Sequence, residues 1–179
     1  MTETSSETTE ATPTDARSRE LAELLDSRIA SRETRKEDWE TLKFQTKAGP
    51  EFARAQIRYI GSGATGDHED DANIIPSMNF TLSNMLLPPG GVGPEHVHDD
   101  AEEVFFVLEG QIEVTLLDGE ARATRTLGYR DAVSIPPGVA RALRNPGPGH
   151  ALFCVMIGAK KPQLPWYPET SPVAGITRD

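Results

Sequence analysis

From residue 51 onward, apolar and polar residues alternate in short runs, a pattern typical of β-strands with one buried face. Glycine, proline and aspartate separate the runs, as they do at tight turns. Asp118-Gly119, between two such runs, indicates a β-hairpin. Closely spaced strands of this kind predict a small antiparallel barrel or jelly roll. We predict strands over residues 52–60, 79–87, 111–117, 121–127, 132–135, 139–144 and 151–157.

The residues before the strands follow a helical pattern. From Ser18 the apolar positions are three to four residues apart, which predicts an amphipathic helix. A second helical segment is indicated by a capping box of Thr34 and Glu37, followed by Trp39 and Leu42 on one face. We expect both helices to dock on the main domain or on a partner subunit. The apolar positions of the first helix are Leu21, Leu24, Leu25 and Ile29.

These patterns divide the chain into four parts. Residues 1–16 are polar and acidic and read as a disordered tail. Residues 17–50 form an N-terminal helical extension, and residues 51–160 form the barrel. Residues 161–179 are rich in proline and are expected to lie over the surface.

Composition and charge exclude some classes of function. The 179 residues carry a net charge of −10, which argues against binding nucleic acid. We expect no membrane span, because no run of 18 apolar residues occurs. The N-terminus lacks the features of a signal peptide, so a cytoplasmic location is expected. The single cysteine, Cys154, lies in an apolar run and is expected to be a buried structural thiol.

Candidate chemistry is concentrated between Gly90 and Gly110. His96 and His98 are two residues apart, so both imidazoles point to one side of an extended strand. Glu103 is at an odd offset from them, but the polar residues 99–101 predict a bend that re-aims the chain. Two imidazoles and one carboxylate suit a divalent ion such as iron, manganese, nickel or zinc.

This stretch resembles the first signature of the cupin superfamily, G-x5-H-x-H-x4-E-x6-G. All five fixed positions are matched, by Gly90, His96, His98, Glu103 and Gly110.

The second cupin signature, G-x5-P-x-G-x2-H-x3-N, is matched in part. Pro136, Gly138 and Asn145 stand at its proline, second glycine and asparagine. Arg130 stands at its first glycine. Either this departure is tolerated, or the glycine position is offset to Gly128. Arg141 stands at its histidine, which is the fourth metal ligand in cupins that keep the full set.

The resemblance implies an all-β double-stranded β-helix, the cupin jelly-roll barrel, with the site inside one end. It also implies a small single-domain protein and a homodimer. His96, His98 and Glu103 carry over as metal ligands, and two histidines with one carboxylate suit non-haem iron(II) with positions left for substrate and dioxygen. His68 or His150 could replace the missing ligand, although we expect both to be solvated loop residues.

Arg141 needs an anion, because its matched position points into the barrel and a guanidinium neither loses its charge nor binds metal. One candidate is Glu103, in a salt bridge that competes with the metal. The other is the carboxylate or enolate of a substrate, held beside the metal.

Aromatic residues could shape the pocket for an aromatic substrate. Phe105 and Phe106 are either pocket walls or plain barrel core, and core is the commoner outcome. Trp166 and Tyr167 could cover the mouth of the barrel or seal a subunit interface.

The leading interpretation is a metal-dependent enzyme that acts on a small organic anion. The favoured activity is that of a non-haem iron(II) dioxygenase, with His96, His98 and Glu103 on the metal and Arg141 on the substrate. A lyase or isomerase could use the same site as a Lewis acid. A metal-free cupin that binds or senses a small acid through Arg141 is the alternative from another class.

Overall fold

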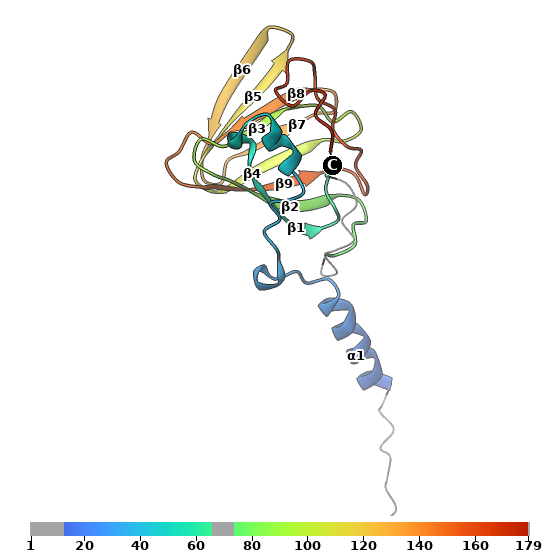
Figure 1. The fold of residues 1–179 in the computed structure, drawn as a ribbon. Helices are drawn as coiled ribbons and strands as arrows, with labels where there is room; N and C mark the ends of the chain where they lie inside the picture. The colour runs from blue at the N-terminus through green and yellow to red at the C-terminus, as the bar shows by residue number, and fades with distance from the viewer. Residues whose placement is uncertain (1–12, 66–73, 179) are drawn as a thin grey trace, which may run out of the picture.

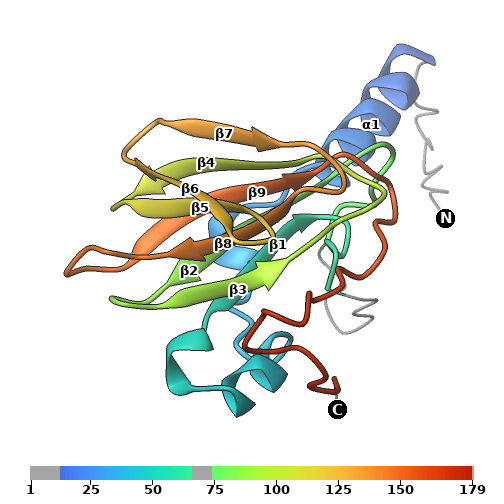
Figure 2. The same cartoon turned by 90° about the horizontal axis from the view of Figure 1, so that it is seen from above.

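Two antiparallel sheets face each other and enclose the core of the protein (Figures 1 and 2). The computed structural model describes residues 13–65 and 74–178. One sheet has the strand order β1-β2-β9-β4-β7, and the other has the order β3-β8-β5-β6. The predicted all-β, double-stranded β-helix is therefore confirmed. The strands are β1 (Ala55–Ile60), β2 (Thr81–Leu87), β3 (Val92–His96), β4 (Glu103–Glu109), β5 (Ile112–Asp118), β6 (Ala121–Leu127), β7 (Ala132–Ile135), β8 (Ala140–Arg144) and β9 (Ala151–Ile157).

The alternation seen in the sequence sets which side chains reach the core. In β4, Glu103, Phe105 and Val107 are buried, and the residues between them are half-buried. The ring of Phe105 packs edge to face on Phe153 of β9, with 5.7 Å between their centroids. The predicted hairpin is present, since β5 and β6 pair up to Asp118 and are joined by a two-residue turn. Glu103 is therefore an ionisable residue on an otherwise apolar inner face.

The residues that match the two cupin signatures hold turns at the ends of strands. Gly110 has a φ of +71°, and a β-carbon there would lie 2.7 Å from the carbonyl oxygen of His150. Arg130 has a φ of +69° and is the only non-glycine residue with a positive φ in the described part of the chain. It thus adopts the backbone conformation that a glycine takes most easily. The side chain of Asn145 is buried and donates to the carbonyl oxygens of Leu87 and Gly149, at 3.0 and 2.8 Å.

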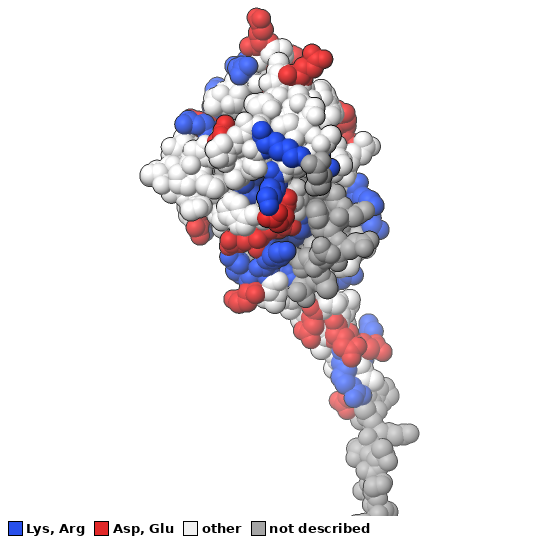
Figure 3. Space-filling view, in the orientation of Figure 1, with Lys and Arg blue, Asp and Glu red and all other residues white. Residues whose placement is uncertain are grey.

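The N-terminal extension contains one α-helix, α1 (Pro13–Asp26), which projects away from the barrel (Figure 1). Residues 13–16 of the predicted tail are thus helical, and residues 1–12 lie outside the described residues. No helix in the described residues is both long enough and apolar enough to cross a membrane. Both positive and negative side chains occur along α1 (Figure 3).

The apolar face of α1 is exposed, so the expectation that it docks on the barrel was wrong. Docking of this face on a partner subunit stays a prediction. The exposed fractions are 49% for Leu21, 54% for Leu24, 61% for Leu25 and 57% for Ile29.

The prediction of a second helical segment that begins at Thr34 was also wrong. This region forms three short 3₁₀ helices instead: η1 (Arg32–Thr34), η2 (Lys43–Lys47) and η3 (Pro50–Phe52). Thr34 ends the first of these, and its hydroxyl donates to the carbonyl of Ser31 rather than capping a helix. Asp38 forms a β-bridge with Gln56 of β1, so this backbone pairs with the sheet.

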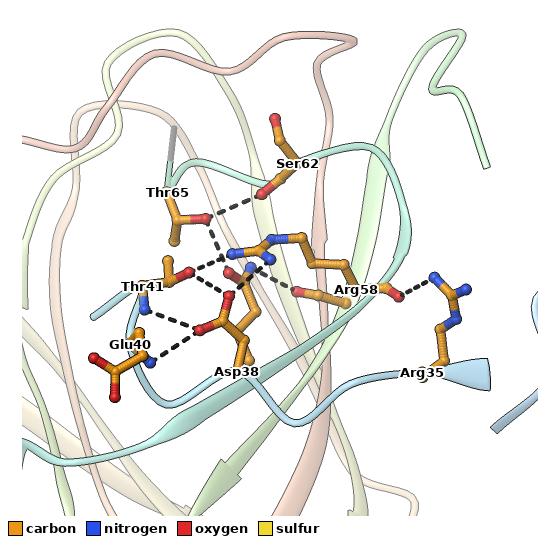
Figure 4. A network of polar contacts seen from close by, with 9 residues as sticks. Arg35, Asp38, Glu40, Thr41, Arg58, Ser62 and Thr65 are labelled. Atoms are coloured by element: carbon orange, nitrogen blue, oxygen red, sulfur yellow. Dashed lines mark hydrogen bonds and ion pairs between the residues drawn. The ribbon is translucent and has the colours of Figure 1, made fainter. Parts of the chain in front are cut away.

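A buried polar network joins this segment to β1 (Figure 4). Arg58 Nη1 lies 3.0 Å from Asp38 Oδ2, and the Arg58 side chain is only 3% exposed. The Asp38 carboxylate also accepts hydrogen bonds from the backbone N–H groups of Glu40 and Thr41, at 2.9 and 3.0 Å. Burial acts to raise the pKa of Asp38, but the hydrogen bonds from Thr41, Arg58 and Glu40 lower it well below its ordinary value.

We predict that Asp38→Ala lowers the free energy of unfolding by about 3 kcal/mol, because it leaves the buried Arg58 guanidinium without its partner. Urea denaturation measures the change. Glu113→Ala is the control: its partner, Arg144, is 58% exposed, and removing an exposed pair costs at most about 1 kcal/mol. Equal losses in the two variants would contradict the structural role of Asp38.

The same pair predicts a pH dependence. The folded-state pKa of Asp38 is lowered, so its stabilising effect is complete above the ordinary pKa of 3.8 and is lost as the pH falls below it. The difference in unfolding free energy between wild type and Asp38→Ala should therefore shrink below about pH 4. A difference that stays constant down to pH 2 would show that the ion pair is not its source.

Candidate metal centre

Backbone pairing brings His96 and His98 to one end of the barrel. His96 is the last residue of β3 and pairs with Arg141 of β8. The carbonyl oxygen of His98 accepts a 2.8 Å hydrogen bond from the backbone N–H of Gly138. The two imidazole rings are perpendicular, with 5.2 Å between their centroids. The two-residue spacing thus places both rings at one site, as the sequence predicted.

Glu103 reaches the same site from the first position of β4. The chain bends at Asp99 and Asp100, as the sequence predicted, and then enters the other sheet. Glu103 pairs there with Ile135 and Ile157 and is 4% exposed. Donor atoms of the two imidazoles and this carboxylate lie within 4.8 Å of one another. Two sheets therefore contribute to one cluster.

The tautomer of His96 leaves a lone pair facing Glu103. Its Nδ1 lies 2.8 Å from the carbonyl oxygen of Pro94, which can only accept a hydrogen bond, so Nδ1 carries the hydrogen. Burial lowers the pKa of His96 below 6.5 and outweighs the opposing effect of Glu103, so the ring is neutral at pH 7. Its Nε2 then has no hydrogen and lies 3.5 Å from Glu103 Oε2. Two acceptors that face each other in this way need a cation between them.

Other buried polar atoms of the cluster also lack hydrogen-bond partners. His98 Nε2 lies 3.6 Å from Glu103 Oε1, and neither His98 Nδ1 nor Glu103 Oε2 has a hydrogen-bond partner although both are buried. Burying a polar atom without a partner costs about 1–3 kcal/mol. Ligands bound to one ion at about 2.1 Å lie about 3.0–3.4 Å apart, close to the spacing seen here. The cluster fits a divalent ion.

Burial alone would raise the pKa of the Glu103 carboxyl. Positive charge or a proton on the facing nitrogens of His96 and His98 holds this pKa far below its ordinary value, and a metal ion in the place of that proton would have the same effect. The group is therefore ionised at neutral pH and can bind a cation.

Arg141 is fully buried beside this carboxylate. Its Nε lies 3.4 Å from Glu103 Oε2, and its Nη1 donates to the backbone carbonyl of His96 at 3.5 Å. Burial lowers the pKa of Arg141, and Glu103 partly offsets this. An ionised carboxylate offers about four lone-pair positions, so Glu103 can pair with Arg141 and still bind a metal. Of the two anions expected for Arg141, the structure provides the internal one; its role in substrate binding stays a prediction.

The three candidate ligands open into a cavity of about 70 Å³. This volume holds a few water molecules or one small ligand. Of the four aromatic residues that could line a pocket, Phe105 and Tyr167 do so, and Phe105 is also part of the barrel core; Phe106 and Trp166 are not in the lining. Trp166 is 49% exposed and its backbone pairs with that of Val97.

Of the two spare histidines, His150 is exposed and is not part of the cluster, as expected for a loop residue. His68 lies outside the described residues. Cys154 is half-buried rather than fully buried; its Sγ donates to Asn84 Oδ1 at 3.3 Å, and burial raises its thiol pKa.

The sequence interpretation missed the part of the cavity wall that lies outside the barrel strands. This wall includes Leu42 and Gln45 from the N-terminal segment, Arg54 just before β1, and Arg178 near the C-terminus. Arg54 had one visible signal, a charged residue inside the apolar run FARAQIRYI. Leu42 belonged to a predicted helical face, and Gln45 and Arg178 carry no local pattern; only the tertiary fold brings these three residues to the site.

Comparison with known proteins agrees with the fold and the site. The model of the cupin domain matches residues 83–158. Germin-like protein subfamily 2 member 2 of Arabidopsis thaliana is 27% identical over 121 residues, which are 59% of this chain and 55% of the relative. Germin-like protein subfamily 2 member 1 of the same plant is 35% identical over 95 residues, 51% of this chain and 42% of the relative. The chain thus spans about half the length of these relatives.

Solved structures show the same fold at low sequence identity. A structure of oxalate oxidase superposes with a TM-score of 0.53 at 21% identity, covering 76% of this chain and 62% of the other. Peruvianin-I, described as a cysteine peptidase from the latex of Thevetia peruviana, superposes with a TM-score of 0.57 at 18% identity, covering 78% and 77%.

The strand order, the His-His-Glu cluster and the domain match define a β-barrel protein with a candidate site for a divalent metal inside one end. Residues 83–158 of the chain thus form a cupin domain.

We predict that Arg141→His increases the affinity for a divalent metal by at least about tenfold, because it adds a neutral fourth ligand and removes a positive charge beside the ion. Zinc titration against a chromophoric chelator measures the affinity. Arg144→His is the matched control, since Arg144 lies on the same strand but is exposed. An Arg141→His protein that binds zinc no better than this control would contradict the assignment of the site.

Proposed function

We propose that this cupin is a metal-dependent enzyme that acts on a small organic anion, with iron(II) as the favoured metal and dioxygenation as the favoured reaction. The observation that carries the proposal is the apposition of His96 Nε2 and Glu103 Oε2, two acceptor atoms 3.5 Å apart in a buried site. Only a proton or a metal ion relieves that arrangement. His98 completes a facial set of two imidazoles and one carboxylate, which suits non-haem iron.

Each residue of the cluster has a separable task. The hydrogen bond from His96 Nδ1 to Pro94 fixes the ring so that Nε2 faces the site. Glu103 supplies the negative charge, and Arg141, with its Nε 3.4 Å from Oε2, holds this carboxylate in place. The apolar wall that includes Phe105 and Phe153 limits the access of water.

Iron(II), when bound to this set, supplies the one-electron chemistry that allows dioxygen to react with an organic molecule. In a dioxygenation both oxygen atoms enter the substrate, and the substrate supplies all the electrons, so no other reductant is needed. Manganese, nickel and zinc fit the same donor atoms. The similarity to an oxalate oxidase structure supports an oxidative reaction on a small acid, although at 21% identity it shows only the shared fold.

A second candidate function rests on the ion pair between Arg141 and Glu103. If this pair holds the carboxylate away from metal, the protein is a cupin that binds a small acid without catalysis. Metal content separates the two candidates.

We predict that the protein, purified without chelator, contains close to one transition-metal ion per chain. His96→Ala should reduce this content at least about tenfold, because a buried site with two remaining ligands holds metal weakly. Elemental analysis by mass spectrometry gives the content. His150→Ala is the control, since that histidine is exposed and outside the cluster. An equal metal content in His96→Ala and wild type would exclude the proposed site.

We also predict that anaerobic reconstitution with iron(II) gives a protein that consumes dioxygen when a suitable small phenolic or keto acid is added. An oxygen electrode measures uptake across a panel of such acids. Glu103→Gln is the negative control, because the amide lacks the charge that a dication needs. Uptake that is equal in this variant would assign the activity to free iron instead.

A further inference from the structure

Arg54 is a buried arginine that faces the same cavity as the candidate metal ligands. It lies between η3 and β1, and its side chain lines the cavity together with His96, His98 and Glu103. It is 9% exposed. Within the described part of the chain it donates two long hydrogen bonds, from Nη1 to the backbone carbonyls of Phe52 at 3.4 Å and Val92 at 3.5 Å.

Arg54 differs from two other buried arginines. Arg58 lies 3.0 Å from the Asp38 carboxylate, and Arg141 lies 3.4 Å from that of Glu103. No carboxylate among the described residues is paired with Arg54. Burial lowers its pKa to about 10, so the guanidinium is still charged at neutral pH. Among the described residues its charge is balanced only at longer range, by Glu103 and Tyr167, which raise its pKa against burial. A buried charge so weakly matched is costly, which makes Arg54 a candidate binding group for an anion.

The surrounding groups strengthen an anion site. Glu103 is the only acidic side chain among the described residues that line the cavity, and it is already matched by Arg141. Arg178 lines the cavity as well, with its guanidinium 4.8 Å from the centre of the Phe44 ring. Its Nη2 donates to the hydroxyl oxygen of Tyr167 at 3.3 Å. The cavity wall therefore carries the guanidinium groups of Arg54 and Arg178 and the hydroxyl of Tyr167 in addition to the candidate metal ligands.

We propose that Arg54 is the anion-binding residue of this cavity and holds the carboxylate of a small acid whose apolar body packs against Phe105 and Phe153. Arg141 stays with Glu103. This inference rests on the proposed function in one respect, the orientation of the acid. Its reacting end would lie toward the three candidate metal ligands. The volume of about 70 Å³ restricts the acid to a few heavy atoms.

A purely structural role for Arg54 predicts different behaviour. If its two backbone hydrogen bonds hold the Phe52 turn against β3, replacing it destabilises the protein. If it is an anion-binding residue, a methionine of similar length removes an unpaired buried charge and leaves the melting temperature equal or higher.

The test is calorimetric binding of 2-methylpropanoate and of its neutral analogue 2-methylpropanamide to the protein as purified. Wild type should bind the acid at least about tenfold more tightly than the amide, the range of a charge-assisted hydrogen bond. Arg54→Met should abolish this preference, with no change in affinity for the amide and no drop in melting temperature. Arg54→Lys should keep part of the preference, because it retains the charge without the planar fork. Arg144→Met, on an exposed arginine, should bind both probes as wild type does.

Two results would overturn the proposal. One is an Arg54→Met protein that prefers the acid as strongly as wild type. The other is loss of the preference in Arg141→Met but not in Arg54→Met, which would place the anion at Arg141.

Metal content, measured on the same samples, separates this inference from the proposed function. If wild type contains no metal but its preference for the acid still depends on Arg54, the metal-dependent enzyme is refuted and the anion site is supported. If wild type contains metal but its acid binding does not depend on Arg54, the anion site is refuted and the proposed enzyme is unaffected.

Discussion

One carboxylate, that of Glu103, connects the two sheets electrostatically at the end of the barrel. Glu103 belongs to β4 in one sheet. Three groups face it: His96 and Arg141 belong to the other sheet, and His98 belongs to the segment that follows β3. Burying this negative charge is unfavourable unless positive partners surround it. The neutral tautomer of His96 leaves a lone pair, and not a positive charge, beside this carboxylate. A divalent ion would supply the missing charge.

The backbone around the site limits how far these groups can move. The hydrogen bond from the backbone N–H of Gly138 to the carbonyl of His98 fixes the loop after β3, and the pairing of His96 with Arg141 fixes the end of that strand. These contacts keep the donor atoms in place without a ligand, which lowers the cost of binding one.

The sequence was sufficient for the barrel and for the candidate metal ligands because both depend on local spacing. Strand alternation predicted the antiparallel barrel, and fixed spacing identified His96, His98 and Glu103. The sequence was insufficient for the N-terminal extension. The pattern around Trp39 predicted a helix, but the backbone there pairs with the sheet through the β-bridge between Asp38 and Gln56. The sequence also indicated Arg141 and not Arg54 as a binding residue, because Arg141 stands at a position of the cupin signature and Arg54 lies outside both signatures.

The cavity wall has a consequence for how this protein can change. The three candidate ligands lie within residues 83–158, the part that matches the cupin domain, whereas Gln45, Arg54, Tyr167 and Arg178 lie outside it. Part of the cavity wall is therefore encoded in stretches of the chain that are separate from the candidate metal ligands. Substitutions in these stretches would change the shape and charge of the cavity while the three candidate ligands stay the same, so ligand preference could diverge without any change in the part that matches the cupin domain.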